Sequence, residues 1–243
     1  MERRLYKTLL SIAQYYNHHL TPEQIEKLFS YGQLLKEQNR LFNLTGFKTE
    51  AEIFENIICE AITMVTLQEF EDPNTSVVDV GSGAGIPGIP LSILFPHLSL
   101  TFIESNAKKC GFISDVLYRL QLPKGFIVCQ RAETAGRVDH LRDTFDIGIS
   151  RALASTAVAL ELVSPFVRVG GSAVFVKGPR IFEELQVSRD ALLRLECALE
   201  RLFAVPLPGY HRLIYYAVVR KNKVTPPSYP RRVGIPQKRP LSC

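Results

Sequence analysis

The chain of 243 residues contains no tryptophan and only two methionines, and its five cysteines are scattered. No two of them form a C-x-x-C pair, so the spacing typical of a zinc site is missing. An odd number of cysteines also argues against a disulfide framework. We therefore expect no bound metal and reduced thiols, with Cys59, Cys110, Cys129 and Cys197 buried in the core.

Long hydrophobic runs are missing as well. No stretch approaches the ~20 apolar residues that a membrane-spanning helix needs. The first residues, MERRLYKTLLSIAQYY, are basic but lack the apolar run and the small-residue cleavage site of a secretory signal. Hydrophobic residues make up 46% of the chain and charged residues 22%, which is typical of a soluble globular protein. We expect a cytoplasmic protein that does not bind a membrane.

Acidic residues are absent from the end of the chain. Residues 220–243 contain seven of the 29 lysines and arginines. The rest of the chain has 22 basic and 24 acidic residues. The net charge of +5 therefore comes from this segment, which is also rich in proline (PPSYPRRVGIPQKRP). Such a composition does not build a core of its own. Two interpretations stay open: a basic strand that binds a phosphate backbone, or a solvated tail that aids solubility.

The first part of the chain predicts helices. Thr21 is an N-cap, Pro22 occupies the first helical position and Gln24 completes a capping box, so a helix over 21–39 is expected. A second helical region lies near 50–70. These helices predict an N-terminal cap over residues 1–70.

From residue 77 onward, short apolar β-rich runs alternate with helical stretches. The predicted strands are VVDV (77–80), LTFIE (100–104), FIVC (126–129), FDIGIS (145–150) and SAVFVK (172–177), and the predicted helices lie near 89–95, 107–121, 155–168 and 181–201. LIYYAVV (213–219) is expected to be the edge strand of a final hairpin. The alternation predicts an α/β fold, a mainly parallel twisted sheet with helices on both faces. We expect this domain to span 71–221 and the basic tail 222–243.

A glycine-rich loop follows the first predicted strand in VVDVGSGAGIPGIP (77–90). Gly81 and Gly83 let a ligand approach the backbone closely at the carboxyl end of a parallel strand. The segment 83–88 matches the dinucleotide fingerprint G-x-G-x-x-G, but it begins three residues after the strand and contains a proline. The carboxylate of Asp79 would repel a diphosphate and suits a cationic ligand. A tight turn without a ligand is the third interpretation.

Acidic residues at the next strand ends extend this candidate site. Glu104 ends the second predicted strand, where a carboxylate can accept hydrogen bonds from both ribose hydroxyls. Asp79 and Glu104 together favour an adenosyl ligand without phosphate, such as S-adenosylmethionine. The third strand leads to Ala132 and Glu133, in the position that commonly contacts adenine, and the fourth to Arg151, where methyl donor and acceptor would meet. Glu133 is equally consistent with an ordinary solvated loop residue, and Arg151 is consistent with a surface residue at the start of a helix.

Seven segments, in order from about residue 31 to 241, resemble the RsmG (GidB) family of bacterial small-subunit ribosomal RNA methyltransferases. They are NLTG, VVDVGSGAGIPGIPLSILFP, the RAE of QRAET, ISRALAS, VFVKG, HRLIYY and YPRRVGIPQKRPL. The resemblance implies a Rossmann-like methyltransferase, expected to be a monomer, that uses S-adenosylmethionine to methylate N7 of one guanine in the decoding-region loop of 16S rRNA. The substrate is the naked rRNA, an assembly intermediate or the small-subunit particle.

The same resemblance assigns roles to the site residues. Gly81 and Ile86 would line the cofactor pocket, Ala132 and Glu133 would contact the adenosyl group, and Arg151 would lie at the reaction centre as the catalytic residue. Glu104 occupies the ribose-binding position, and the basic tail with Lys177 would hold phosphates. The segment ENIICEA (55–61) departs from the family's usual R-H-I-L-D-S, with Asn56 and Glu60 in place of the usual His and Asp.

Two functions from other classes remain as alternatives. A nicotinamide-dependent oxidoreductase would bind NADH at the glycine loop, which would raise its melting temperature. A non-catalytic RNA-binding module with the same fold would bind RNA with a steep salt dependence and transfer no methyl group.

Overall fold

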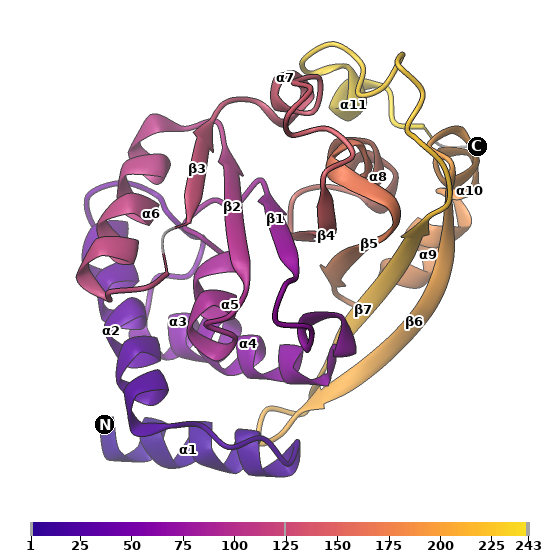
Figure 1. Cartoon of the computed structure of the whole chain (residues 1–243). Helices are drawn as coiled ribbons and strands as arrows, with labels where there is room; N and C mark the ends of the chain where they lie inside the picture. Colours follow the sequence, from indigo (N-terminus) through magenta and orange to yellow (C-terminus); the bar gives the residue numbers. More distant parts are fainter. Residues whose placement is uncertain (1, 124, 242–243) are drawn as a thin grey trace.

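A computed structural model describes residues 2–123 and 125–241 as a seven-stranded sheet between layers of helices (Figure 1). The strands are β1 (Ser76–Val80), β2 (Ser99–Glu104), β3 (Phe126–Cys129), β4 (Phe145–Arg151), β5 (Val167–Lys177), β6 (Cys197–Leu207) and β7 (Arg212–Lys221). The helices before the sheet are α1 (Glu2–Tyr15), α2 (Pro22–Asn39), α3 (Glu50–Ile53), the π-helix η1 (Phe54–Cys59), α4 (Glu60–Ile62), and the 3-10 helices η2 (Thr63–Thr66) and η3 (Gln68–Phe70). Within and after the sheet follow α5 (Gly88–Leu94), α6 (Ala107–Arg119), α7 (Ala132–Ala135), α8 (Thr156–Val163), the 3-10 helix η4 (Ser164–Phe166), α9 (Ile181–Gln186), α10 (Arg189–Arg194) and α11 (Ile235–Lys238).

The strand order is β3-β2-β1-β4-β5-β7-β6, in which the first five strands are parallel and β7 runs antiparallel to both of its neighbours, β5 and β6. The chain leaves β1 toward β2 on one side and returns to β4 on the other, so the order reverses between β1 and β4. In open sheets of this kind, ligands bind beyond the carboxyl ends of the strands at such a reversal. The predicted α/β fold with a mainly parallel sheet is confirmed.

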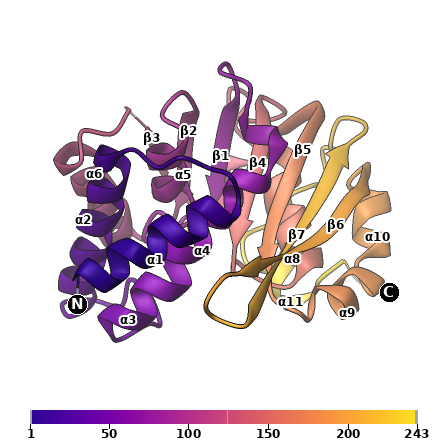
Figure 2. The same ribbon diagram turned by 90° about the horizontal axis from the view of Figure 1, so that it is seen from below.

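Successive side chains of the strands point to opposite faces of the sheet and belong to two buried hydrophobic clusters, one on each face. In β1, Val77 joins the cluster under α1, α2, α5 and α6, whereas Val78 and Val80 join the cluster under α8. Figure 2 shows α1 to α4 grouped together, and these helices are called the helical cap below. The cap and the sheet share one hydrophobic core, since Leu28 and Ile58 belong to the same cluster as Val77.

The cap also reaches the glycine loop through polar contacts. Helix α2 carries the predicted capping box, in which Thr21 and Gln24 bond reciprocally. The Gln24 side chain also donates to the carbonyl oxygens of Ile93 and Leu94 at the end of α5, at 3.0 and 3.1 Å. The buried Tyr31 hydroxyl donates to the carbonyl oxygen of Ala84 at 2.9 Å. Helix α2 therefore supports the loop that follows β1.

The C-terminal part of the sheet differs from the prediction. The helix expected to run to residue 201 ends with α10 at Arg194, and strand β6 begins at Cys197. Residues 197–202 include good helix formers, but pairing with β7 along the whole of β6 outweighs that preference. The prediction of β7 as an edge strand was also wrong, because β7 lies between β5 and β6 and β6 forms the edge.

Two local expectations also need correction. The helix predicted over 155–168 ends at Val163, where η4 and then β5 follow. Among the cysteines, Cys59, Cys110 and Cys197 are buried as expected, but Cys129 is exposed on β3, the other edge strand. Cys243 lies outside the described residues.

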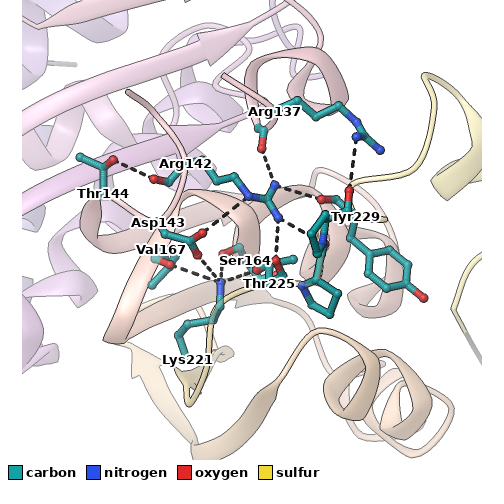
Figure 3. Close-up of polar contacts among 12 residues, drawn as sticks. Arg137, Arg142, Asp143, Thr144, Ser164, Val167, Lys221, Thr225 and Tyr229 are labelled. Atoms are coloured by element: carbon teal, nitrogen blue, oxygen red, sulfur yellow. Dashed lines mark hydrogen bonds and ion pairs between the residues drawn. The ribbon is translucent and has the colours of Figure 1, made fainter. Parts of the chain in front are cut away.

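The basic C-terminal segment is packed onto the domain beside α7 and α8 (Figure 1). Arg231 forms a 2.6 Å ion pair with Glu161, whose side chain is fully buried in α8. Figure 3 shows a second anchor, where Arg142 donates to the carbonyl oxygens of Thr225 and Tyr229, at 2.7 and 2.9 Å. Buried polar partners thus hold a segment whose composition predicts no core, and Leu241 joins the cluster under α8.

The same close-up shows the fully buried Lys221 at the end of β7 (Figure 3). Its ammonium group is 3.0 Å from the Asp143 carboxylate and donates to the Ser164 carbonyl oxygen at 2.7 Å. Burial lowers the pKa of Lys221, while the adjacent Asp143 acts in the opposite direction. This buried cation therefore joins the sheet to the start of the C-terminal segment.

Candidate functional site

The loop after β1 has a backbone that favours glycine. Gly81, Gly83 and Gly85 have φ values of +70°, +58° and +86°, which lie in the left-handed region. A Cβ atom on Gly81 would lie 2.3 Å from Cδ1 of Leu153, in the segment after β4. A side chain at residue 81 would therefore collide with this leucine.

Asp79 is fully buried beneath the glycine loop. Its Oδ2 accepts a hydrogen bond from the Gly88 N–H at 2.9 Å, while Oδ1 has no partner among the described residues. Burial raises the pKa of Asp79 to about 7, since it outweighs the Gly88 hydrogen bond, and the Glu104 carboxylate raises it further. A buried acceptor without a donor among the described residues, under a glycine-rich loop, fits a site for a ligand that carries positive charge.

Glu104 lies beside Asp79 at the end of β2 and bonds directly to the loop. One carboxylate oxygen accepts the Gly83 N–H at 2.9 Å, and the other accepts the Asn106 N–H at 2.8 Å. The Gly83 N–H, which a dinucleotide-binding loop would offer to a diphosphate, is thus bonded to a carboxylate. Each oxygen keeps further acceptor capacity, as binding of ribose hydroxyls requires.

The predicted residues after β3 are arranged differently from those around the loop. Ala132 is half-buried at the start of α7, and Glu133 is buried. One oxygen of Glu133 accepts the N–H of Gly234 from the C-terminal segment at 2.9 Å, and the other lies 3.6 Å from Arg131. The proposed contact between Glu133 and an adenosyl group stays a prediction, since the structure gives this carboxylate a protein partner.

Arg151, at the end of β4, is held by the helical cap. Its Nε donates to Oε1 of Glu60 at 2.6 Å and its Nη2 to the carbonyl oxygen of Asn56 at 2.7 Å. Arg151 and Ile86 line one small cavity together with Pro87, so the predicted catalytic arginine and the end of the glycine loop meet. Asp79, Gly81, Gly83 and Glu104 lie at the tips of β1 and β2, whereas Ala132 and Glu133 lie in α7 after β3.

A cavity of about 860 Å³ opens on the other side of Arg151. It lies beyond the carboxyl ends of β4 and β5 and the start of β7, and its walls include Glu60, Arg151, Arg180 and Arg212. This volume lies within the range typical of small-molecule sites. The glycine loop does not line this cavity, so the structure offers a loop for one ligand and a cationic cavity for another.

Lys177 also lines this cavity, but it is not a free phosphate ligand. Its ammonium group donates to Glu184 at 2.9 Å and to the carbonyl oxygen of Ala154 at 2.7 Å.

Arg212 belongs to the HRLIYY segment, yet no role could be assigned to it from the sequence. Its position in the cavity wall depends on contacts between distant parts of the chain.

Comparison with known proteins bears on this arrangement. The family model GidB, described as rRNA small subunit methyltransferase G, matches residues 24–205. The chain belongs to this family. Relatives named ribosomal RNA small subunit methyltransferase G include one from Acetivibrio thermocellus, 37% identical over 99% of this chain and 98% of its own length. Another, from Leuconostoc citreum, is 38% identical over 92% of this chain and 93% of its own.

Solved structures of low sequence identity share the fold. The TYW2 protein of M. jannaschii, determined in complex with AdoMet, has a TM-score of 0.50 and 17% identity, and the match covers 67% of this chain and 74% of that one. A mutant of MtNAS has a TM-score of 0.54 and 14% identity, covering 88% and 76%. These likenesses support the Rossmann-like architecture of the GidB-family chain.

Two searches of the described residues bear on other classes of function. None of the helices over 2–123 and 125–241 is long and apolar enough to span a membrane. Within the same ranges, no group of three or more His, Cys, Asp or Glu side chains is arranged to hold a metal ion. The groups that converge at the site are carboxylates, guanidinium groups and backbone amides.

Proposed function

We propose that this GidB-family protein binds S-adenosylmethionine across the glycine loop and transfers its methyl group to N7 of one guanine in the decoding-region loop of 16S rRNA. The observation that carries the proposal is the hydrogen bond between Glu104 and the Gly83 N–H, next to Oδ1 of Asp79, which has no partner within residues 2–123 and 125–241. A ligand at this loop meets two carboxylates, which favours a ribose and a cation over a diphosphate. A role as an rRNA methyltransferase requires such an adenosyl ligand.

The residues present fit this cofactor. Glu104 would bind the ribose hydroxyls, Asp79 would favour the positive charge of the methionine part, and Gly81 would let the ligand approach the backbone. When bound, S-adenosylmethionine would supply an electrophilic methyl group: the in-plane lone pair of guanine N7 would form the new bond as the sulfur–methyl bond breaks, and S-adenosylhomocysteine would be the leaving group. No base has to remove a proton first, so the protein aligns donor and acceptor. Alignment of this kind contributes roughly 7–11 kcal/mol in intramolecular analogues.

Arg151 is the residue we propose at the reaction centre. A guanidinium group is well suited to bind O6 of a guanine and thereby fix the plane of the base. The base has to leave its stack to reach the cavity, which suits a loop nucleotide of the RNA. The proposed place of action is the cytoplasm, and the proposed active form is a monomer.

Methyl transfer tests this function directly. Purified protein is incubated with methyl-labelled S-adenosylmethionine and either naked 16S rRNA or small-subunit particles, and the labelled nucleoside is identified and mapped. We expect 7-methylguanosine at one decoding-region position. Label at another atom, or no label on either substrate, would contradict the proposal. A melting temperature raised by NADH and not by S-adenosylmethionine would favour the oxidoreductase alternative.

Three exposed cations of the C-terminal segment are the best candidates for RNA contacts in that segment. Ion pairs engage its other four, Arg220, Lys221, Lys223 and Arg231. Arg232, Lys238 and Arg239 are exposed, and within residues 2–123 and 125–241 they form no ion pair.

The salt dependence of RNA binding measures these contacts. Replacing all three of the exposed cations by Gln should lower the slope of log Kd against log salt by up to roughly 2–3, since each lost phosphate contact contributes about 0.7–0.9. Cofactor affinity should not change. The exposed Arg40 of the helical cap, replaced by Gln, is the control. An unchanged slope in the triple variant would assign the segment to folding alone.

A further inference from the structure

Glu60 joins two arginines that come from different strands of the sheet. Its Oε1 lies 2.6 Å from Nε of Arg151, at the end of β4, and its Oε2 lies 2.9 Å from Nη2 of Arg212, at the start of β7. Both carboxylate oxygens are therefore engaged, each by a different guanidinium group. Glu60 itself is the first residue of α4, in the helical cap.

Asn56 completes the connection one helical turn earlier, in the π-helix η1. Its carbonyl oxygen accepts from Nη2 of Arg151 at 2.7 Å, and its side-chain oxygen accepts from Nη1 of Arg212 at 2.5 Å. Each arginine is thus held at two points by the same segment of the cap. A guanidinium group held at two points has a fixed plane, which a single contact does not provide.

Burial gives these contacts their rigidity. Glu60 is 7% exposed, so its charge depends on the two arginines for compensation. Arg151 retains three N–H donors that neither Glu60 nor Asn56 uses, because a guanidinium group carries five. Both arginines and Glu60 line the cavity of about 860 Å³. Of the charged residues that line the cavity, four are cations (Arg151, Lys177, Arg180 and Arg212) and three are carboxylates (Glu60, Glu183 and Glu184), so the wall keeps a formal net charge of +1 for an anionic ligand.

We propose that Glu60 is a positioning residue for methyl transfer. It holds Arg151 and Arg212 so that their remaining donors face one cavity, where Arg151 binds the guanine edge and Arg212 binds the phosphate of the same nucleotide. Both carboxylate oxygens of Glu60 are engaged by the arginines, so Glu60 acts through them. This inference rests on the proposed function, and it explains how the departures Asn56 and Glu60 are accommodated.

Three substitutions test the inference in the full-length protein. Glu60→Gln keeps the size of the side chain but removes its charge and replaces one acceptor oxygen with a donor that faces a guanidinium group. Glu60→Asp keeps the charge and shortens the side chain by one methylene group. Glu200→Gln is the matched control, because it breaks the 3.0 Å pair between Glu200 and Arg220 in the β6–β7 hairpin, outside the cavity. For each protein, kcat, the KM for 16S rRNA, the Kd for S-adenosylmethionine and Tm are measured.

The expected pattern separates positioning from folding. Glu60→Gln should lower kcat roughly ten- to a hundredfold, since misplacing a reacting partner by about 1 Å has an effect of that size. Its affinity for S-adenosylmethionine should stay within about twofold of wild type, and Glu60→Asp should recover most of the lost kcat. Wild-type kcat in Glu60→Gln would overturn the inference. The inference would also be overturned if kcat fell equally in both Glu60 variants and in proportion to their loss of Tm or of cofactor affinity.

Asn56→Ala provides an independent test if Glu60→Gln does not fold. Asn56 is half-buried, and its side chain holds Arg212 but not Arg151. The KM for rRNA should rise about threefold with kcat retained, by loss of a hydrogen bond to a charged group. An unchanged KM would contradict the role of Arg212. If wild type transfers no methyl group, the proposed function fails and this inference with it. If wild type is active and the variants have the same kinetic constants as wild type, the inference alone fails.

Discussion

Asp79 should make the folded protein less stable as the pH rises from about 4 to about 7. Its pKa is about 7 in the folded chain, against an ordinary value of 3.8, because the carboxyl group is fully buried. Between these two values the folded state binds more protons than the unfolded state, so the free energy of unfolding falls as pH increases. The full loss is roughly 4 kcal/mol and is complete above about pH 7.

Asp79→Asn removes this titration and keeps an oxygen that can accept the Gly88 N–H. The free energy of unfolding of the Asn variant minus that of wild type should increase by roughly 3 kcal/mol from about pH 5 to about pH 8. The absolute gain above neutrality is smaller, since the amide places an unpaired donor where Oδ1 lies, at a cost of about 1–3 kcal/mol. Urea unfolding at both pH values, without cofactor, measures the shift.

Asp146→Asn is the matched control with the opposite sign. Burial acts to raise the pKa of Asp146, but hydrogen bonds from Ser76 and the Arg168 guanidinium group outweigh it and leave the pKa lowered. Its ionised form therefore stabilises the fold above the ordinary pKa of 3.8, so the stability that Asp146→Asn loses relative to wild type should be the same at pH 5 and pH 8 and should shrink only below about pH 4. A difference between Asp79→Asn and wild type that does not change with pH would refute the reasoning about burial.

Three further substitutions test other parts of the account. Gly81→Ala should weaken cofactor binding at least tenfold in calorimetric titration, because residue 81 has a positive φ and the added Cβ collides with Leu153. Gly209→Ala is the control, since its φ is +84° and the space around the added Cβ is open. Wild-type affinity in Gly81→Ala would reject the loop as the site. Glu104→Ala should also weaken binding about tenfold by loss of the ribose contacts, whereas unchanged affinity would remove that assignment. Lys221→Met should reduce the free energy of unfolding by about 3 kcal/mol, since it leaves a partly buried carboxylate without this partner. Lys223→Met, at a 75% exposed side chain, should change stability by less than about 1 kcal/mol, and equal effects would contradict the buried role of Lys221.

The sequence predicted those parts of the fold whose causes are local. Short apolar runs, a capping box and a glycine cluster each act within a few residues, so the parallel strands, α2 and the loop after β1 were predictable. Strand β6 was not, because its residues favour a helix and only pairing with the distant β7 makes them a strand. The packing of the C-terminal segment was hidden for the same reason, since Arg231 meets Glu161 across 70 residues.

The candidate site divides in the same way. Asp79, the glycines and Glu104 could be inferred because parallel strands bring their carboxyl ends together at one edge. The contacts of Arg151 could not, since Glu60 lies 91 residues away from it and 152 residues from Arg212. HRLIYY and ENIICEA were the only signals in the sequence, and neither reveals that one carboxylate connects the two segments.

A crystal structure of the protein with S-adenosylhomocysteine would test the central claim most directly. The account predicts the ribose hydroxyl groups at the Glu104 carboxylate, the nucleotide lying along residues 81–86, and the sulfur atom directed toward the cavity beside Arg151. A ligand bound instead within the cavity lined by Arg180 and Arg212, or Glu104 without contact to the ribose, would contradict it.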